Sequence, residues 1–168
     1  MPQVYVVTIN NRTTSDNFRK SVLRPPFYWG LRRGKGNNSR WAGIEAGDVI
    51  IFKFSEGFIC ARIIGKRIDS QLAAAIWGNS SAGFEMLLEL ETPYELDLQR
   101  DKLSEVLGDR HPGMQRVTHA RLQRAYEKFG QHVFEESLGI AERCSLGPPK
   151  SSSRRCEAAE QRTPFRTS

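Results

Sequence analysis

The sequence predicts an α+β domain built on a curled, largely antiparallel or mixed β-sheet with short helices at its sides. Three observations predict this class. Apolar, β-branched runs of strand length recur along the chain, and each is bounded by Gly, Asn, Asp or Pro. Segments with helical spacing and capping residues lie between these runs. The connections are too short and irregular for a doubly wound parallel fold.

The N-terminal part begins with a strand at residues 4–9, whose β-branched and aromatic side chains are typical of a buried strand. Asp16 is a candidate N-cap for the next helix, because its carboxylate can accept hydrogen bonds from the first helical amides. This helix carries Phe18 and Val22 and ends before Pro25-Pro26. An aromatic cluster and a flexible basic loop follow it.

A β-hairpin is predicted in the middle of the chain. Its two apolar strands, residues 49–54 and 58–64, are separated by a short loop that contains glycine. The helix after the hairpin runs over residues 70–77. Asp69 is its N-cap, and Gly78 occupies the C′ position, where glycine is favoured.

The remaining elements are one strand and three helices. The strand is predicted at residues 84–90, which form a mostly apolar run. Asp101 and Thr118 each cap a helix that ends at a glycine. A last short helix runs from residue 131 to about 138.

These elements form one domain over residues 1–140, and the hydrophobic content of 39% is ordinary for a globular protein. Residues 141–168 are rich in Pro, Ser and Arg and lack hydrophobic spacing, which predicts a flexible tail or linker. No apolar run is long enough to cross a bilayer, and the N-terminus lacks the pattern of a signal peptide. We therefore expect a cytoplasmic protein with no membrane partner.

The residue pattern argues against catalysis and metal binding. The sequence contains no GxSxG elbow, HExxH helix, P-loop or dinucleotide fingerprint. Cys60, Cys144 and Cys156 are widely spaced, and the histidines do not complete a zinc site with them. The catalytic candidates are Asp109-Arg110-His111 and Glu89-Leu90-Glu91, which are typical of a polar loop and of alternating strand faces. We expect a binding module without cofactor or metal.

An aromatic cluster, Phe27-Tyr28-Trp29-Gly30-Leu31, runs directly into a basic segment at residues 32–41. Aromatic faces stack on bases while cations neutralise phosphates. This pattern, together with a net charge of +6 and a pI near 9.5, predicts a nucleic-acid partner. A core aromatic corner beside a solvated loop is the alternative interpretation. The cations expected to hold phosphates are Arg32, Arg33, Lys35, Arg40 and Arg116.

Two tryptophans are candidates for a ligand site. Trp29 lies between a proline turn and a glycine, and Trp77 ends a helix before a polar loop. Both indoles therefore lie near loops that a ligand can reach, although core packing is the alternative for each. For Trp41 we favour packing, since its ring can pin the basic loop onto the sheet.

Several short segments follow one another in a distinctive order. They are residues 5–11, Phe27-Tyr28-Trp29-Gly30-Leu31, residues 47–52, residues 57–65, Ile76-Trp77-Gly78 and residues 84–90. Their order and spacing resemble the PUA-like superfamily, specifically its EVE and YTH branches, over roughly residues 4–130. The resemblance implies a PUA-like curled mixed β-barrel flanked by short helices, with an aromatic pocket for one modified base.

The resemblance also implies roles for individual residues. Trp29 and Trp77 match the two tryptophans that wall the pocket. Asn10 and Asn11 match a polar pair that can bond a base edge. Residues 113–117 resemble a glycine-glutamine segment that closes the pocket, and this similarity gives that role to Gln115.

Gly30 and Leu31 lie in the same implied pocket, where YTH domains carry small polar residues after the tryptophan. This departure puts the YTH specificity for methyladenine in RNA in doubt. The sequence thus predicts a reader that flips one modified base of DNA into an aromatic pocket. The expected base is a methylated or hydroxymethylated cytosine, or a methyladenine.

Two other functions stay open. One is an RNA-binding PUA-like module that recognises modified or single-stranded RNA. The other is a small enzyme or ligand-binding barrel that uses the loop acids. EVE-like domains are often joined to a restriction nuclease. The resemblance therefore also implies a nuclease domain, fused or associated, as a partner.

Overall fold

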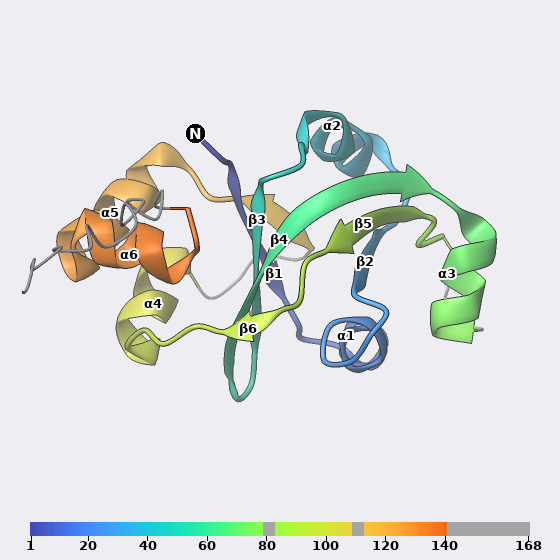
Figure 1. Ribbon diagram of the computed structural model, residues 1–168, viewed down its shortest axis with the longest axis horizontal. Helices are drawn as coiled ribbons and strands as arrows, with labels where there is room; N and C mark the ends of the chain where they lie inside the picture. The colour runs from blue at the N-terminus through green and yellow to red at the C-terminus, as the bar shows by residue number, and fades with distance from the viewer. Residues whose placement is uncertain (79–82, 109–112, 141–168) are drawn as a thin grey trace, which may run out of the picture.

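The computed structural model describes residues 1–78, 83–108 and 113–140 (Figure 1). Its strands are β1 (Val4–Thr8), β2 (Tyr28–Leu31), β3 (Val49–Phe54), β4 (Gly57–Ile68), β5 (Met86–Leu90), β6 (Tyr94–Glu95) and β7 (Met114–Arg116). Its helices are α1 (Arg12–Ser21), α2 (Lys35–Gly43), α3 (Ser70–Trp77), α4 (Arg100–Leu107), α5 (His119–Phe129) and α6 (Gln131–Ser137).

The strands form one mixed sheet that curls into a half-barrel. The strand order is β2-β5-β4-β3-β1-β7, and the short β6 pairs with β4. β1 runs parallel to β3, and the other described pairings are antiparallel. β4 pairs with β3 along its first half and with β5 along its second, and the register shifts between Ile63 and Gly65. Such an irregularity bends a strand, so β4 carries the sheet around the curl and leaves β2 and β7 as its edges.

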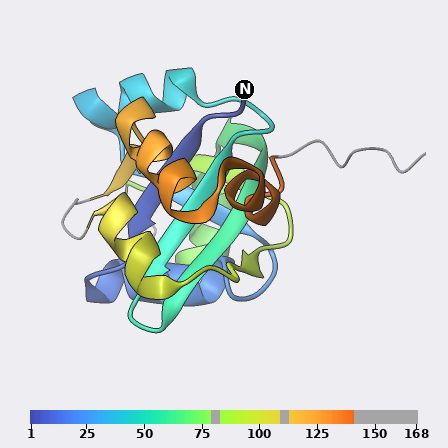
Figure 2. The same cartoon turned by 90° about the vertical axis from the view of Figure 1, so that its left-hand side faces the viewer.

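The two faces of the sheet pack against different partners. Alternation along β1 sends Tyr5 and Val7 into a first core inside the curl, and Val4 and Val6 into a second core on the other face. Helices α4, α5 and α6 cover this second face (Figure 2). Helix α3 packs on β2 and β5 through a third, smaller cluster that contains Trp77.

The predicted α+β class and the curled mixed sheet are confirmed. The hairpin forms between β3 and β4, although β4 continues to Ile68. Helix α3 has the predicted bounds because its ends are encoded locally: the Asp69 carboxylate accepts a hydrogen bond from the Leu72 amide at 2.8 Å. Gly78 follows the helix with a φ of 61°, a left-handed value that favours glycine.

The C-terminal helices also form where they are predicted. The Thr118 side chain caps α5, and α6 begins at Gln131. Helix α4 starts one residue before Asp101, so the prediction that Asp101 is its N-cap is wrong. Its carboxylate lies in the first turn instead, where its negative charge interacts favourably with the positive end of the helix dipole.

Helix α1 begins earlier than predicted. Its N-cap is Asn11, whose side-chain oxygen accepts a hydrogen bond from the Thr14 amide at 2.9 Å. The Asn11 backbone amide in turn donates to the Thr14 hydroxyl at 3.3 Å, which completes a capping box. The prediction of Asp16 as the cap is therefore wrong, because Asn11, five residues earlier, accepts the hydrogen bond from the Thr14 amide.

The basic segment forms helix α2 rather than the predicted flexible loop. Two glycines and the absence of a clear apolar stripe hide this helix in the sequence. Tertiary packing stabilises this helix although its intrinsic helix propensity is low. Trp41 packs against the first core, as predicted for this side chain. The preceding aromatic cluster forms β2, which sequence reasoning did not assign to a strand.

Replacing Asn11 with alanine should lower the free energy of unfolding by about 1 kcal/mol, because the capping box on α1 is lost. The neighbouring Asn10→Ala is the matched control, since Asn10 bonds no amide of α1 and only accepts a 3.4 Å hydrogen bond from the Asn11 side-chain nitrogen. Urea unfolding of the two variants checks the prediction. Equal destabilisation by both changes would contradict the role of the cap.

Residues 141–168 lie outside the described residues, so the flexible tail and the domain boundary at residue 140 stay predictions. Within the ranges that the structure describes, no helix is long and apolar enough to span a membrane.

Candidate nucleic-acid interface

A cavity of about 570 Å³ opens where the curled sheet does not close; we call it the seam cavity. The edge strand β2 forms one side, and β1 with the start of β7 forms the other. The start of α1 and residues around the start of α2 complete its walls. The residues that line it are Val7, Thr8, Asn10, Asn11, Arg12, Thr13, Thr14, Trp29, Gly30, Leu31, Arg32, Asn37, Phe84, Gly113 and Met114.

Strand β2 turns its outer backbone edge toward the seam cavity. The Leu90 amide donates to the Phe27 carbonyl at 3.0 Å, and the antiparallel register places Trp29 opposite Leu88. Hydrogen-bonded positions alternate in an antiparallel pair, so the N–H and C=O groups of Gly30 point away from β5. Because Gly30 lines the cavity, its backbone offers one donor and one acceptor to the edge of a planar ligand.

The apolar wall of the cavity is centred on Trp29. Its side chain is 4% exposed, and its ring packs edge-on against Phe52 with the centroids 5.1 Å apart. Leu31 lies on the same face of β2, two residues further along. Phe84 and Met114 extend the wall. Phe84 was not predicted in the site, and Met114 lies in the segment predicted to close the pocket, where Gln115 was given that role. This wall can accept the face of a base and a small apolar substituent on it.

Trp77 does not line the seam cavity. It is 1% exposed, its indole N–H donates to the Ser21 hydroxyl at 3.0 Å, and its ring packs edge-on against Phe84. The ring lies directly over the Cα of Gly30, on the face of β2 opposite to Trp29. The prediction that the two indoles meet across one cavity is therefore wrong. Trp77 supports β2 from its other face.

Gln115 also lies away from the cavity. Strand pairing places it opposite Val6, on the face of the second core, while Met114 lies opposite Val7 and lines the cavity. The prediction that the Gln115 side chain closes the pocket is wrong, because successive strand residues point to opposite faces. The predicted segment does reach the cavity through Gly113 and Met114.

The two asparagines after β1 line the cavity, as the resemblance implies. They do not have equal freedom. The Asn11 side chain caps α1 through its oxygen and donates through its nitrogen to the Asn10 oxygen at 3.4 Å. Asn10 therefore presents its amide nitrogen as a hydrogen-bond donor, while Asn11 holds the helix and orients its neighbour.

Two arginines give the seam cavity a positive character. Arg12 opens helix α1, and the Arg32 guanidinium lies over the Phe84 ring, 4.5 Å from its centroid. The described residues that line the cavity include no Asp or Glu. The amino end of α1 adds the positive end of a helix dipole. The cavity therefore favours an electron-rich or anionic ligand; only Arg32 of these two was predicted.

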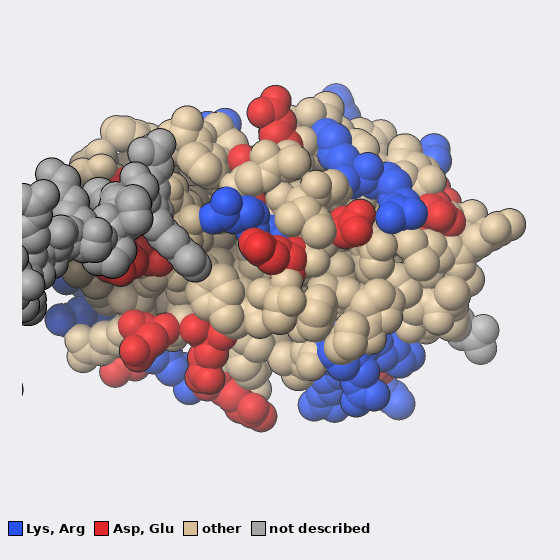
Figure 3. All heavy atoms as spheres, in the orientation of Figure 1, with Lys and Arg blue, Asp and Glu red and all other residues tan. Residues whose placement is uncertain are grey.

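The other predicted cations lie outside the cavity. Arg33 forms an ion pair with Glu85, and Arg40 donates to the Asn37 side chain at 3.1 Å. Lys35 is exposed at the start of α2, and Arg116 is exposed on β7. Figure 3 shows Lys and Arg side chains gathered beside α2 and along β4, and a second group below α1. Cations thus lie near α1 and near α2, the two helices whose first turns contribute to the cavity lining.

The acidic catalytic candidates do not form a site in the described structure. Glu89 lies 3.4 Å from Arg67 and Glu91 lies 3.7 Å from Arg62, so both carboxylates are engaged in surface ion pairs. Asp109-Arg110-His111 lies outside the described residues. Burial raises the pKa of the Cys60 thiol to about 12, which disfavours the reactive thiolate.

Comparison with known proteins identifies the fold. No protein-family model matches the sequence, and no curated protein matches it. The solved N-terminal domain of McrB from Thermococcus gammatolerans, bound to m5C DNA, is similar with a TM-score of 0.53 and 15% identity, over 75% of this chain and 96% of that chain. A complex of the YTH domain-containing protein mmi1 with RNA has a TM-score of 0.49 and 12% identity, over 82% of this chain and 87% of that chain. This chain therefore has an α+β PUA-like fold, the fold of the McrB N-terminal domain.

Proposed function

We propose that this chain is a non-enzymatic reader domain that takes one modified base of DNA into the seam cavity. The observation that carries the proposal is the composition of that cavity. An indole wall at Trp29, an open backbone edge at Gly30 and two arginines surround a hollow without acidic residues in its described lining. The McrB domain of the same fold was solved with m5C DNA, which supports this choice of ligand.

The energetics suit a flipped base. Extracting a base from a duplex costs a few kcal/mol, and stacking on an aromatic side chain returns about 1–3 kcal/mol. Phosphate contacts from cations such as Lys35 supply affinity that does not depend on sequence. The modified base then needs only a small additional gain to be preferred.

The apolar wall supplies that gain. A methyl group on the base would lie against Leu31, Phe84 and Met114. Binding then removes the apolar surface of both partners from water, which is favourable. One methyl-sized group in a hydrophobic pocket changes binding by about 10- to 200-fold. We propose 5-methylcytosine first, with hydroxymethylcytosine and methyladenine as the other candidates.

Titration of matched oligonucleotides tests the proposal. Duplexes that differ in a single base, plain or modified, should differ in Kd by about tenfold or more. A matched RNA belongs to the same series, and tighter binding of RNA than of DNA would overturn the choice of DNA. Equal affinity for plain and modified oligonucleotides would overturn the reader function itself.

Lys35→Ala should weaken the binding of plain and modified DNA by the same factor and reduce the salt dependence of log Kd by about one unit of slope, because a phosphate contact carries no base information. Measurements at several salt concentrations check this result. A change in the ratio of modified to plain affinity would show that Lys35 contacts the base instead.

A nuclease partner and a cytoplasmic location stay predictions.

A further inference from the structure

A second hollow lies on the other side of the corner that joins β2 to α2. It has a volume of about 160 Å³ and is lined by Arg33, Asn38, Trp41, Ile68 and Met86. We call it the Trp41 cleft. An indole and two aliphatic side chains make it mainly apolar, while an arginine and an amide border it.

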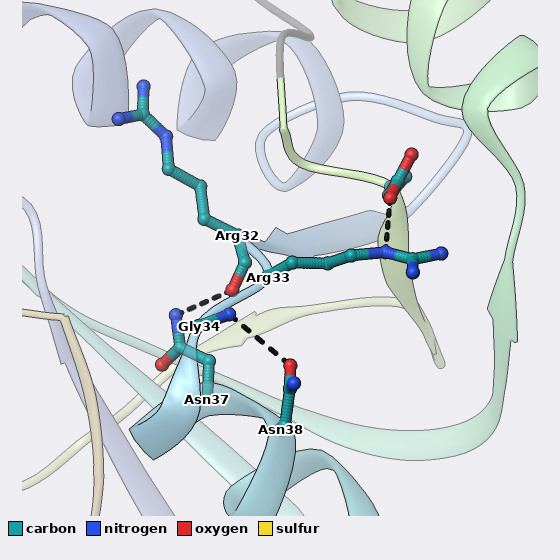
Figure 4. A network of polar contacts seen from close by, with 6 residues as sticks. Arg32, Arg33, Gly34, Asn37 and Asn38 are labelled. Atoms are coloured by element: carbon teal, nitrogen blue, oxygen red, sulfur yellow. Dashed lines mark hydrogen bonds and ion pairs between the residues drawn. The ribbon is translucent and has the colours of Figure 1, made fainter.

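Consecutive residues divide between the two hollows. Arg32 lines the seam cavity and Arg33 lines the Trp41 cleft, and Asn37 and Asn38 divide in the same way. Figure 4 shows the two arginine side chains leaving the chain in different directions. The corner at residues 32–38 therefore separates two neighbouring sites.

Polar contacts fix the shape of this corner (Figure 4). The Asn37 side chain donates to the Arg32 carbonyl at 2.8 Å, and the Gly34 amide donates to the Asn38 oxygen at 3.3 Å. The ion pair between Arg33 and Glu85 connects the corner to the residue just before β5. A ligand that spans both hollows would therefore cross a corner whose shape is already fixed before binding.

The surroundings of the Trp41 cleft match a nucleotide. The Lys66 ammonium nitrogen lies 5.6 Å from the centre of the Trp41 ring and donates to the Trp41 carbonyl at 2.6 Å. The exposed Lys35 lies on the same helix as Trp41. Ile68 is 56% exposed, so a ligand in the cleft can reach its side chain. An apolar floor with an aromatic ring and bordering cations suits a base and its phosphate.

We propose that the Trp41 cleft binds the base of a nucleotide within two positions of the modified one, on the same strand. The strand then crosses the corner at residues 32–38, with the modified base in the seam cavity and its neighbour in the cleft. This proposal rests on the proposed function, because the seam cavity must hold the first base.

The substrate class follows from the two sites together. Unpairing a second base costs an energy of the same order as stacking it on an aromatic ring, so a closed duplex gains little from the second site. A strand that is already unpaired beside the modified base gains the full stacking contribution. The preferred ligand is therefore a modified base with a single-stranded or mismatched neighbour.

Single-stranded oligonucleotides with one modified base and abasic positions one or two steps away on either side provide the test. For the wild-type protein, one abasic position should weaken binding by about 5- to 150-fold, the range for loss of one base stack. In Trp41→Ala that abasic penalty should disappear, and in Trp41→Phe part of it should return. A penalty that survives in a folded Trp41→Ala would overturn the proposal.

A second pair of variants does not depend on the Trp41 packing. Ile68→Glu places a carboxylate in the cleft and should reduce the abasic penalty to near zero. Ile64→Glu makes the same change at a position that is 49% exposed on the same strand and outside the described lining of both hollows, and it should keep the penalty. Equal penalties in both variants would overturn the Trp41 cleft as the site.

The outcomes separate the two proposals. Wild-type protein that prefers the modified base but shows no abasic penalty would overturn the second site alone. Wild-type protein that binds plain and modified strands equally would overturn the reader function, whatever the abasic series shows.

Discussion

Replacing Trp29 with alanine is expected to abolish the preference for modified DNA and to lower the free energy of unfolding by about 3–5 kcal/mol. Both effects have one origin. The ring is nearly buried, packs on Phe52 in the first core, and also forms the aromatic wall of the seam cavity. Its removal therefore leaves a hollow in the core and takes away the stacking surface.

Trp29→Phe separates the two effects, because a smaller aromatic ring keeps part of the packing and part of the stacking. The matched control is Trp77→Phe, which changes an equally buried indole outside the described lining of the seam cavity. We expect this control to lose stability and to retain the ratio of modified to plain affinity. Urea unfolding and oligonucleotide titration measure the two quantities. Loss of the ratio in a folded Trp77→Phe would show that Trp77 contacts the base.

Replacing Gly30 with alanine should impair folding and binding together. A Cβ on Gly30 would lie 2.7 Å from two carbons of the Trp77 ring and 3.0 Å from the Phe84 Cβ. These groups are buried, so relief of the clash requires β2 to move, and overpacking of this kind costs about 1–3 kcal/mol. Since β2 is one side of the seam cavity, its displacement should weaken the binding of modified and plain DNA.

Gly34→Ala is the control for this change, because a Cβ there would meet no atom within 4 Å. We expect it to shift stability by no more than about 0.5 kcal/mol, as is usual for an exposed surface substitution. A double-mutant cycle gives a stricter test. Gly30→Ala should cost less in a Trp77→Phe background, because the smaller ring leaves room for the methyl group. Equal costs in both backgrounds would contradict the packing of Trp77 on β2.

The candidate site shows how far residue types alone lead. Trp29 and Arg32 were selected from the sequence for their chemistry, Asn10 was selected through the family resemblance, and all three line one cavity. Arg12 lines it too, but no aromatic cluster singled out its segment. Met114 also lines it and lies in the segment that the resemblance selected, although the role was given to Gln115. Assigning Asn11 as the N-cap of α1 would have placed Arg12 in the first turn of this helix, next to Asn10.

The errors at Trp77 and Gln115 have separate physical causes. Trp77 ends helix α3, which packs on the face of β2 opposite to Trp29, so its indole lies away from the cavity. The Gln115 side chain faces away because of its position on strand β7. A strand changes face at every residue, so a shift of one position exchanges inside for outside. Gln115 and Met114 illustrate this directly, because strand pairing decides which of the two faces the curl.

Elements with strong local signals were predictable from residue pattern alone. The hairpin of β3 and β4, and helix α3 between Asp69 and Gly78, follow from apolar runs and capping groups that act within a few residues. The gap between β2 and β7, in which the cavity opens, depends instead on the packing of the whole domain. The closure of a sheet depends on strand order and register across the whole domain, and no local stretch of sequence encodes these.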